Sequence, residues 1–211
     1  GVRTLAKADG VYALLEAPGF DDYSARFAAP PVVAAAALSV AVRDPAGQFL
    51  ARRVQIELPR DPDPARAHEA GSLFRPLAVA LYPAPAARPE HDWARLYLSV
   101  ADSSGAPAAH ALIRVERAAD ASLLGRAMCD ARGEALAAVA GIPLTPWSDA
   151  DGPLLGRELE VRVRAFHDPA GALPPDPDEL DARRAELAAT AVLVRIAAGR
   201  AQSLALRLPA P

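Results

Sequence analysis

The nine-residue stretch Glu158–Phe166, Glu-Leu-Glu-Val-Arg-Val-Arg-Ala-Phe, alternates between charged and apolar side chains along most of its length. In an extended strand this alternation places the apolar residues on one face and the charged ones on the other. The apolar face consists of Leu159, Val161, Val163 and Ala165. A slip of one residue would expose this whole set to water, so the pattern also specifies the register. The stretch predicts a strand with one buried face and one solvated face.

The same period-two pattern recurs through the rest of the chain. Apolar residues alternate over the segments 38–42, 54–58, 77–81, 96–100, 111–115, 192–196 and 204–208. Asp44–Gly47 and Asp168–Gly171 both read Asp-Pro-Ala-Gly, which matches the residue preferences of a type I turn. Many short alternating strands with turns between them favour an antiparallel sandwich or barrel. We therefore predict an all-β fold, an antiparallel sandwich preceded by an N-terminal β extension.

One short helix is predicted in the C-terminal half of the chain. Asp176 can cap it, Pro177 suits the first helical position, and Glu179 lies three residues after the cap. Good helix formers continue to Ala189, so the prediction covers residues 177–189. We expect this helix to pack over a sheet edge or over an open end of the sandwich.

A charged, proline-rich stretch interrupts the strand pattern at Pro59–Arg66. Such a composition is typical of a stiff connection between folded parts. It predicts an N-terminal β unit over residues 1–60, a linker over residues 61–72, and a sandwich over residues 73–211.

Composition restricts the partners that the chain can have. Hydrophobic residues make up 52% of its 211 residues, enough for a real core, and the net charge is −3. Arginines are scattered among acids rather than gathered in a stripe, so no nucleic-acid partner is expected. No basic-then-apolar leader and no apolar run of about 20 residues is present. Cys129 is the only cysteine, so we expect a cytoplasmic protein without a disulfide framework or a membrane partner.

Histidines and carboxylates are the side chains of this sequence that could bind a metal ion. His91 and His167 are each followed by aspartate, but neither lies in a predicted helix with further histidines at ligand spacing, and His68 and His110 have no such partners either. The loop Ser148–Gly152 alternates acids in a manner that suits Ca²⁺, yet it lacks the later bidentate glutamate of a full calcium loop. We expect no metal and no cofactor.

Candidate nucleophiles also lack a catalytic context. Cys129 has no predicted helix N-terminus or basic cluster beside it, so it is interpreted as a buried structural thiol. Ser72, Ser148 and Ser203 lie outside any Gly-x-Ser-x-Gly motif. The sequence therefore predicts a protein that is not an enzyme.

Aromatic residues beside proline-rich loops are the candidate interface residues. Trp93 and Trp147 each lie next to such a loop and could anchor a partner, because buried tryptophans contribute strongly to binding. The alternative, that each caps an end of a small alanine-rich core, stays open. Phe74 and Tyr82, in the segment that follows the predicted linker, complete the predicted interface set.

Two stretches carry a family resemblance. Residues 105–116 read Gly-Ala-Pro-Ala-Ala-His-Ala-Leu-Ile-Arg-Val-Glu, and from Gly125 the chain reads Gly-Arg-Ala-Met-Cys-Asp-Ala-Arg-Gly-Glu-Ala-Leu. Together they resemble the carboxypeptidase-regulatory-like, or transthyretin-like, β-sandwich family. Cys129 stands where the family usually has threonine and Ala135 where it usually has an aromatic residue. The resemblance implies a sandwich of immunoglobulin or transthyretin type and a turn at Asp130–Gly133, but no particular function.

A wider resemblance concerns the order of segments along the chain. "DGVYAL" at residues 9–14, "VRDPAGQFL" at 42–50 and "SLFRPLAVALYPAPA" at 72–86 precede the stretches above and "ELEVRVRAF". This order resembles uncharacterised proteins of phage-tail-like contractile injection systems. It implies a structural subunit, at a cap or terminus, whose partners are tube, sheath or cap proteins or further copies of itself. The alternative hypothesis is a carbohydrate- or peptide-binding sandwich module, which would expose aromatic residues along one face.

Overall fold

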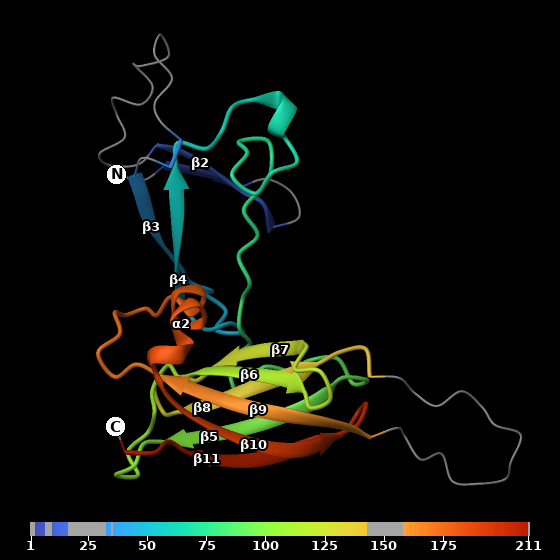
Figure 1. Ribbon diagram of the computed structural model, residues 1–211. Coiled ribbons are helices and arrows are strands. Elements are labelled where there is room, and N and C mark those ends of the chain that lie inside the picture. Colours follow the sequence, from blue (N-terminus) through green and yellow to red (C-terminus); the bar gives the residue numbers. More distant parts are fainter. Residues whose placement is uncertain (1–2, 7–9, 17–32, 35, 143–157, 211) are drawn as a thin grey trace, which may run out of the picture. The chain divides into compact units, whose positions relative to one another are not determined.

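The computed structural model describes residues 3–6, 10–16, 33–34, 36–142 and 158–210. The chain divides into two compact units (Figure 1). Unit 1 comprises Gly1–Val40 and Gln55–Val79, and unit 2 comprises Ala41–Val54 and Ala80–Pro211. The segment 61–72, predicted as a linker, lies within unit 1.

Unit 2 contains two β-sheets that form the layers of a sandwich (Figure 1). The four-stranded sheet has the order β10 (Ala188–Ile196), β9 (Leu159–His167), β6 (Leu112–Arg117) and β7 (Leu123–Met128). The three-stranded sheet has the order β11 (Ala201–Arg207), β5 (Ala94–Ala101) and β8 (Glu134–Val139). The predicted all-β fold is confirmed.

All strand pairs of the sandwich are antiparallel except one. β11, the last strand of the chain, runs parallel to β5, the first strand of the sandwich. In the immunoglobulin constant-domain order the first two strands share one sheet, whereas here β5 and β6 lie in different sheets.

Along β9, the apolar residues of the alternating pattern are the ones that are buried in the core. Val161, Val163 and Ala165 are fully buried between the sheets, and Leu159 packs partly against the same core. The core side chains are small, with seven alanines among them: Ala94, Ala108, Ala111, Ala127, Ala135, Ala137 and Ala165. The turn at Asp130–Gly133 also forms as expected, because the Gly133 amide donates to the Asp130 carbonyl at 3.1 Å and Gly133 has a φ of +75°.

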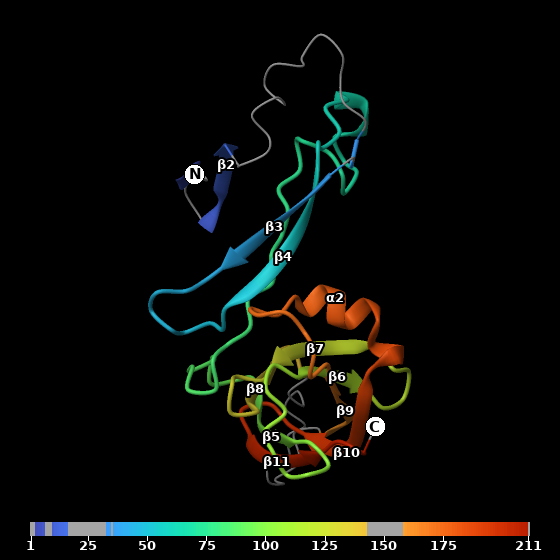
Figure 2. The same ribbon diagram turned by 90° about the vertical axis from the view of Figure 1, so that its left-hand side faces the viewer.

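A second, smaller apolar cluster covers the outer face of the four-stranded sheet. Leu112 of β6 and Phe166 of β9 point away from the main core and pack against Leu180 of α2 (Pro177–Ala182). Both views show α2 lying over β6 and β7 (Figures 1 and 2). The helix therefore covers a sheet face, not the edge or the open end that was expected.

The helix starts as predicted and ends earlier. The carboxylate of Asp176 accepts hydrogen bonds from the amides of Asp178 and Glu179, at 3.1 and 3.4 Å, so it is the predicted cap. After a 3₁₀ turn, η3 (Arg184–Glu186), the chain enters β10, where Ala188 pairs with His167. Pairing with β9 outweighs the helix propensity of residues 188–189, because tertiary context overrides propensity.

One predicted strand does not form, and two described strands of the sandwich form that alternation did not predict. Residues 77–81 form no strand. The segment lies between Pro76 and Pro83, and none of the described strands pairs with it. β7 and β8 were not found by alternation, although the family resemblance covers both. Ala135, Leu136 and Ala137 of β8 are all buried, so this strand has no solvated face and no polar residue to mark the period.

Unit 1 contains short antiparallel strands, the predicted N-terminal β extension. β1 (Arg3–Ala6) pairs with β2 (Tyr12–Glu16), and β3 (Ala36–Val42) pairs with β4 (Arg52–Leu58). The turn end of the second pair, Ala41–Val54, belongs to unit 2. There Asp44 accepts from the amides of Ala46, Gln48 and Phe49, as the Asp-Pro-Ala-Gly motif predicts.

Candidate functional site

In the described part of unit 1, most apolar side chains are exposed or only partly buried. Where burial is described, β1, β2 and β3 contain no buried residue. The exposed apolar residues of the first strand pair are Leu5, Val11, Tyr12, Leu14 and Leu15. The buried residues described in unit 1 are Pro59, Asp61 and Ser72, so Pro59 is the only buried apolar residue in these parts of the unit.

The loop between residues 60 and 75 is nevertheless firmly held. The guanidinium of Arg60 donates to the carbonyls of Ala70, Ser72 and Arg75, at 2.7, 3.0 and 3.0 Å. The backbone closes on itself, because the Asp61 amide donates to the Gly71 carbonyl at 3.0 Å. A guanidinium with three carbonyl partners is a strong constraint on loop geometry.

The held loop presents two neighbouring apolar side chains to solvent. Leu73 is 58% exposed and Phe74 is 57% exposed. Phe74 was one of the predicted interface residues, and it is available for contact with a partner. Because the loop is ordered by Arg60, binding there would require little further ordering of the backbone. We call Leu73 and Phe74 the unit 1 knob.

In unit 2, three arginines lie side by side on the outer face of the four-stranded sheet. Arg114 of β6 pairs in register with Arg126 of β7 and with Arg164 of β9. Like charges directly opposite each other destabilise a sheet. This arginine row therefore needs neighbouring acids.

The acids come from α2 and from β6 itself. Asp181 accepts from Arg114 at 2.5 Å and lies 3.4 Å from Arg126. Glu116 accepts from Arg114 at 2.8 Å, and the Arg164 guanidinium lies 4.0 Å from Glu116. The helix is thus fixed to the sheet by charge as well as by Leu180. Hydrogen bonds to Glu116 and Asp181 raise the pKa of Arg114 although burial alone would lower it.

The same helix binds a fully buried arginine of β4. Arg52 has a side-chain exposure of 0% and donates to Asp178 at 2.5 Å and to the Ala80 carbonyl at 2.9 Å. Its guanidinium also lies 3.5 Å from Asp176 and 5.8 Å from the centre of the Tyr82 ring, within cation–π distance. Arg52 therefore ties the turn end of the β3–β4 pair to α2 inside unit 2.

Asp178 joins Arg52 to the arginine row, because its second oxygen lies 3.2 Å from Arg126. Partial burial would raise the pKa of Asp178, but Arg52 and Arg126 outweigh it and hold the pKa below the usual value. A carboxyl group with a lowered folded-state pKa contributes stability above its unfolded pKa and loses it as the pH falls through the folded pKa.

We expect the free energy of unfolding to fall as the pH drops below about 4, because the carboxyl of residue 178 takes up a proton there in the unfolded chain, whereas in the folded protein Asp178 stays ionised to a lower pH. Asp178→Asn should remove part of this acid dependence and lower the stability near neutral pH. Urea unfolding at a series of pH values checks this for both proteins. Parallel stability curves for the wild type and Asp178→Asn would contradict it.

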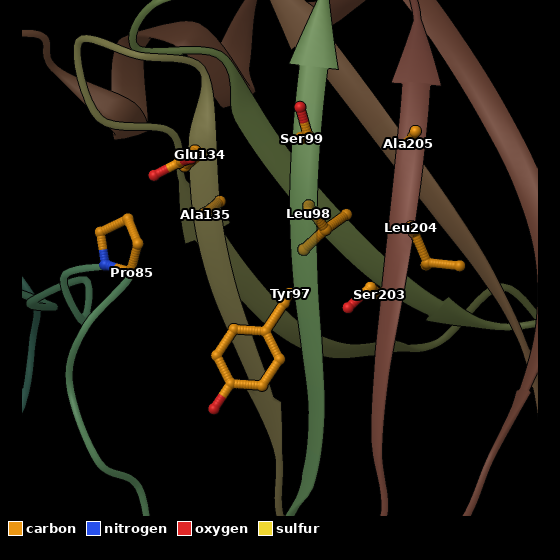
Figure 3. Close-up of a pocket in the computed structure, with 9 residues that line it drawn as sticks. All are labelled: Pro85, Tyr97, Leu98, Ser99, Glu134, Ala135, Ser203, Leu204 and Ala205. Atoms are coloured by element: carbon orange, nitrogen blue, oxygen red, sulfur yellow. The ribbon is translucent and has the colours of Figure 1, made fainter.

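A shallow groove lies on the outer face of the three-stranded sheet (Figure 3). Its volume is about 470 Å³, and Tyr97 and Ser99 of β5 project into it beside Glu134 of β8. Pro85 and, from β11, Ser203, Leu204 and Ala205 complete the lining with Leu98 and Ala135. Tyr97 is 38% exposed and is the aromatic ring on this face. The groove combines one ring with hydroxyl and carboxylate groups.

The predicted interface residues differ in their exposure to solvent. Phe74 is exposed, Trp93 is half-buried, and Tyr82 is 2% exposed beneath Arg52. Burial raises the pKa of Tyr82, and its hydroxyl lacks a hydrogen-bond partner among the described residues. Trp147 and the acidic loop Ser148–Gly152 lie outside the described residues.

Two of the candidate catalytic residues, Cys129 and His110, are buried and partly buried, respectively. Cys129 is fully buried in the core, and burial raises its pKa to about 12, so the thiol is held in its neutral form. His110, at a φ of +61°, has a lowered pKa because of burial. Within the described ranges no group of three or more histidine, cysteine, aspartate or glutamate residues could hold a metal ion.

The sequence interpretation missed Arg52, although a signal was present. Every second residue of β4 shares a face, so the alternation places Arg52 on the same face as Val54, Ile56 and Leu58. A charged residue in the apolar phase of a strand indicates a buried charge that needs partners. The partners, Asp176 and Asp178, are more than 120 residues away, and only the fold identifies them.

Comparison with models of known protein families finds no match, and comparison with curated proteins finds none either. In the described part of the chain, no helix is long and apolar enough to cross a membrane. Both family resemblances noted in the sequence therefore stay hypotheses, and function is inferred from the surfaces described above.

Proposed function

We propose that this chain is a non-enzymatic structural or adaptor subunit of a multi-protein assembly and that unit 1 is its binding part. The observation that carries the proposal is the contrast between the two units. Unit 2 has a packed core, whereas the described residues of unit 1 expose their apolar side chains around strands without buried residues.

The short strands of unit 1 would gain stability from a partner. A two-stranded hairpin is marginally stable at best in water, and β1–β2 and β3–β4 are both two-stranded. Burying exposed apolar surface contributes roughly 25 cal/mol per Å². A partner that covers Leu5, Tyr12, Leu14 and the unit 1 knob would supply the burial that these strands lack. Binding to the folded form would then stabilise it by mass action.

The backbone of unit 1 offers a second mode of contact. Among the described strands, each strand of these two-stranded sheets has one edge without a strand neighbour, and such an edge can pair with a strand of another protein. Main-chain hydrogen bonds would then supply the contact, and the alternating side chains of β3 would supply its selectivity.

The kind of assembly is proposed from the segment order noted in the sequence. It favours a phage-tail-like contractile injection particle, assembled in the cytoplasm, in which this chain is a cap or terminal component. Tube, sheath or cap proteins would then be the partners of unit 1.

The test is sedimentation of lysate from the cells that make the protein, followed by electron microscopy and mass spectrometry of the fast fraction. We expect the wild type at fixed stoichiometry in a tube-and-sheath particle. Phe74→Ser should reduce its share in that fraction about tenfold or more, because an exposed aromatic anchor contributes about 2 kcal/mol or more to binding.

Leu173→Ser is the matched control, because Leu173 is 70% exposed in unit 2 and plays no part in the proposed contact. It should sediment as the wild type does. Finding the wild-type chain only as a free, small species would overturn the proposal. That outcome would favour the alternative, a carbohydrate- or peptide-binding module, for which the groove around Tyr97 is the candidate site.

A further inference from the structure

The strand at one end of the four-stranded sheet has an unusual composition for an edge. β10 has nine residues and is the longest of the four strands that end the two sheets, namely β7, β8, β10 and β11. Its first seven residues, Ala-Ala-Thr-Ala-Val-Leu-Val, carry no charge and include no proline. Natural sheets usually protect an edge with charges, prolines, bulges or short strands. The first seven residues of β10 use none of these devices.

The core is also incomplete along this edge. Val192 and Val194 point toward the core of the sandwich and pack against it, yet both remain half-exposed. On the other face of the strand, Leu193 is 54% exposed. Among the described residues β10 pairs only with β9, and its register there shows no shift over the whole strand. A strand added at this edge would bury apolar side chains on both faces.

We infer that β10 is an interface between two copies of this chain, which pair antiparallel through this strand about a two-fold axis. The two four-stranded sheets would then form one continuous sheet. The inference does not depend on the function proposed for unit 1, because it concerns a different surface and needs no other protein.

β10 is complementary to a second copy of itself. When the two-fold axis passes through residue 191, 192 or 193, even-numbered residues lie opposite even-numbered residues of the other copy, and odd-numbered residues lie opposite odd-numbered ones. The core-facing valines of both copies therefore stay on the core side. The strand's one charged residue, Arg195, would face Leu187, Ala189 or Ala191 of the other copy. No like charges meet in any of these registers, and an isologous two-fold contact closes at two copies.

The other edges are less suited to self-pairing. β7 carries Arg126, which is already engaged by Asp178 and Asp181, and β7 is joined to β8 through the Asp130–Gly133 turn. β11 contains Gln202 and Ser203 in its first half and ends at Arg207. The uncharged, apolar edge is therefore at β10.

The test uses the purified full chain and sedimentation equilibrium over a wide concentration range. We expect a reversible monomer–dimer equilibrium. Leu193→Glu should weaken the dimer at least about tenfold, because it places a charge in the paired edge. The monomer should tolerate this change, since Leu193 is exposed and lies opposite Arg162 of β9. Leu123→Lys is the matched control, on the strand at the other end of the same sheet, and should leave the dimer unchanged.

A second measurement identifies the strand directly. The native Cys129 is buried, so cysteines introduced at Ala191 and Leu193 would be the reactive thiols on this sheet. Opposite residues of an antiparallel pair have Cα atoms within disulfide range. Oxidation should link Ala191→Cys to itself, Leu193→Cys to itself, or the two variants to each other, depending on the register. A protein that stays monomeric, a dimer unaffected by Leu193→Glu, or cross-linking no faster than for Leu123→Cys would each overturn the inference.

Discussion

Arg52→Ala is expected to lower the free energy of unfolding by about 3 kcal/mol or more, because it removes one partner of a buried ion pair. The side chain of Asp176 is 3% exposed and would lose its cationic neighbour, and the Ala80 carbonyl would lose a donor. Asp178 would suffer less, since its side chain is 52% exposed and Arg126 remains beside it. Urea unfolding followed by circular dichroism measures the loss.

Hydrogen exchange distinguishes this local role from a general loss of stability. The Arg53 amide donates to the Pro175 carbonyl at 2.7 Å, so its exchange reports whether the turn end of the β3–β4 pair stays attached within unit 2. We expect faster exchange at Arg53 in Arg52→Ala than in a variant of equal global stability. Arg184→Ala is the control, since Arg184 is 44% exposed and pairs with Asp181 at 3.7 Å. It should cost less than about 0.5 kcal/mol, and an equal loss in both variants would refute the role of Arg52.

Gly133→Ala should have an effect of similar or larger size. A Cβ at this position would lie 2.4 Å from the Val100 carbonyl oxygen and 3.2 Å from the Ala108 amide nitrogen, both backbone atoms. The residue also has a φ of +75°, where a side chain is strained. We expect a loss of about 3–4 kcal/mol, from strain together with displacement of β5 from the turn.

Gly47→Ala separates the two causes. Gly47 has nearly the same backbone conformation, with a φ of +67°, but an added Cβ would meet no atom within 4 Å. It should therefore lose only the conformational part, about 1 kcal/mol. Thermal and urea unfolding of both variants give the comparison. Equal losses would show that the close approach to Val100 is unimportant.

Local signals in the sequence were sufficient for strands in which charged and apolar residues alternate regularly. The charged and apolar residues of β9 alternate because one side faces the core, so the pattern contains both the strand and its register. The turn at Asp44–Gly47 and the helix cap at Asp176 are likewise local, since each depends on hydrogen bonds over a few residues. These features could be predicted because their causes lie within the same short segment.

Only the tertiary structure decided which residues would be buried against the pattern and which would remain exposed. Phe166 lies on the polar face of β9 and is buried because α2 covers that face. Arg52 is buried in β4, where Asp178 of α2 pairs with its guanidinium. The exposure of Phe74 and Leu193 likewise depends on the absence of described neighbours over the loop and over β10. Alternation shows which side chains share a face, but what covers that face is determined by segments far away in the chain. For this protein the sequence by itself determined most strands of the sandwich, and the fold determined the remaining strands and the candidate surfaces.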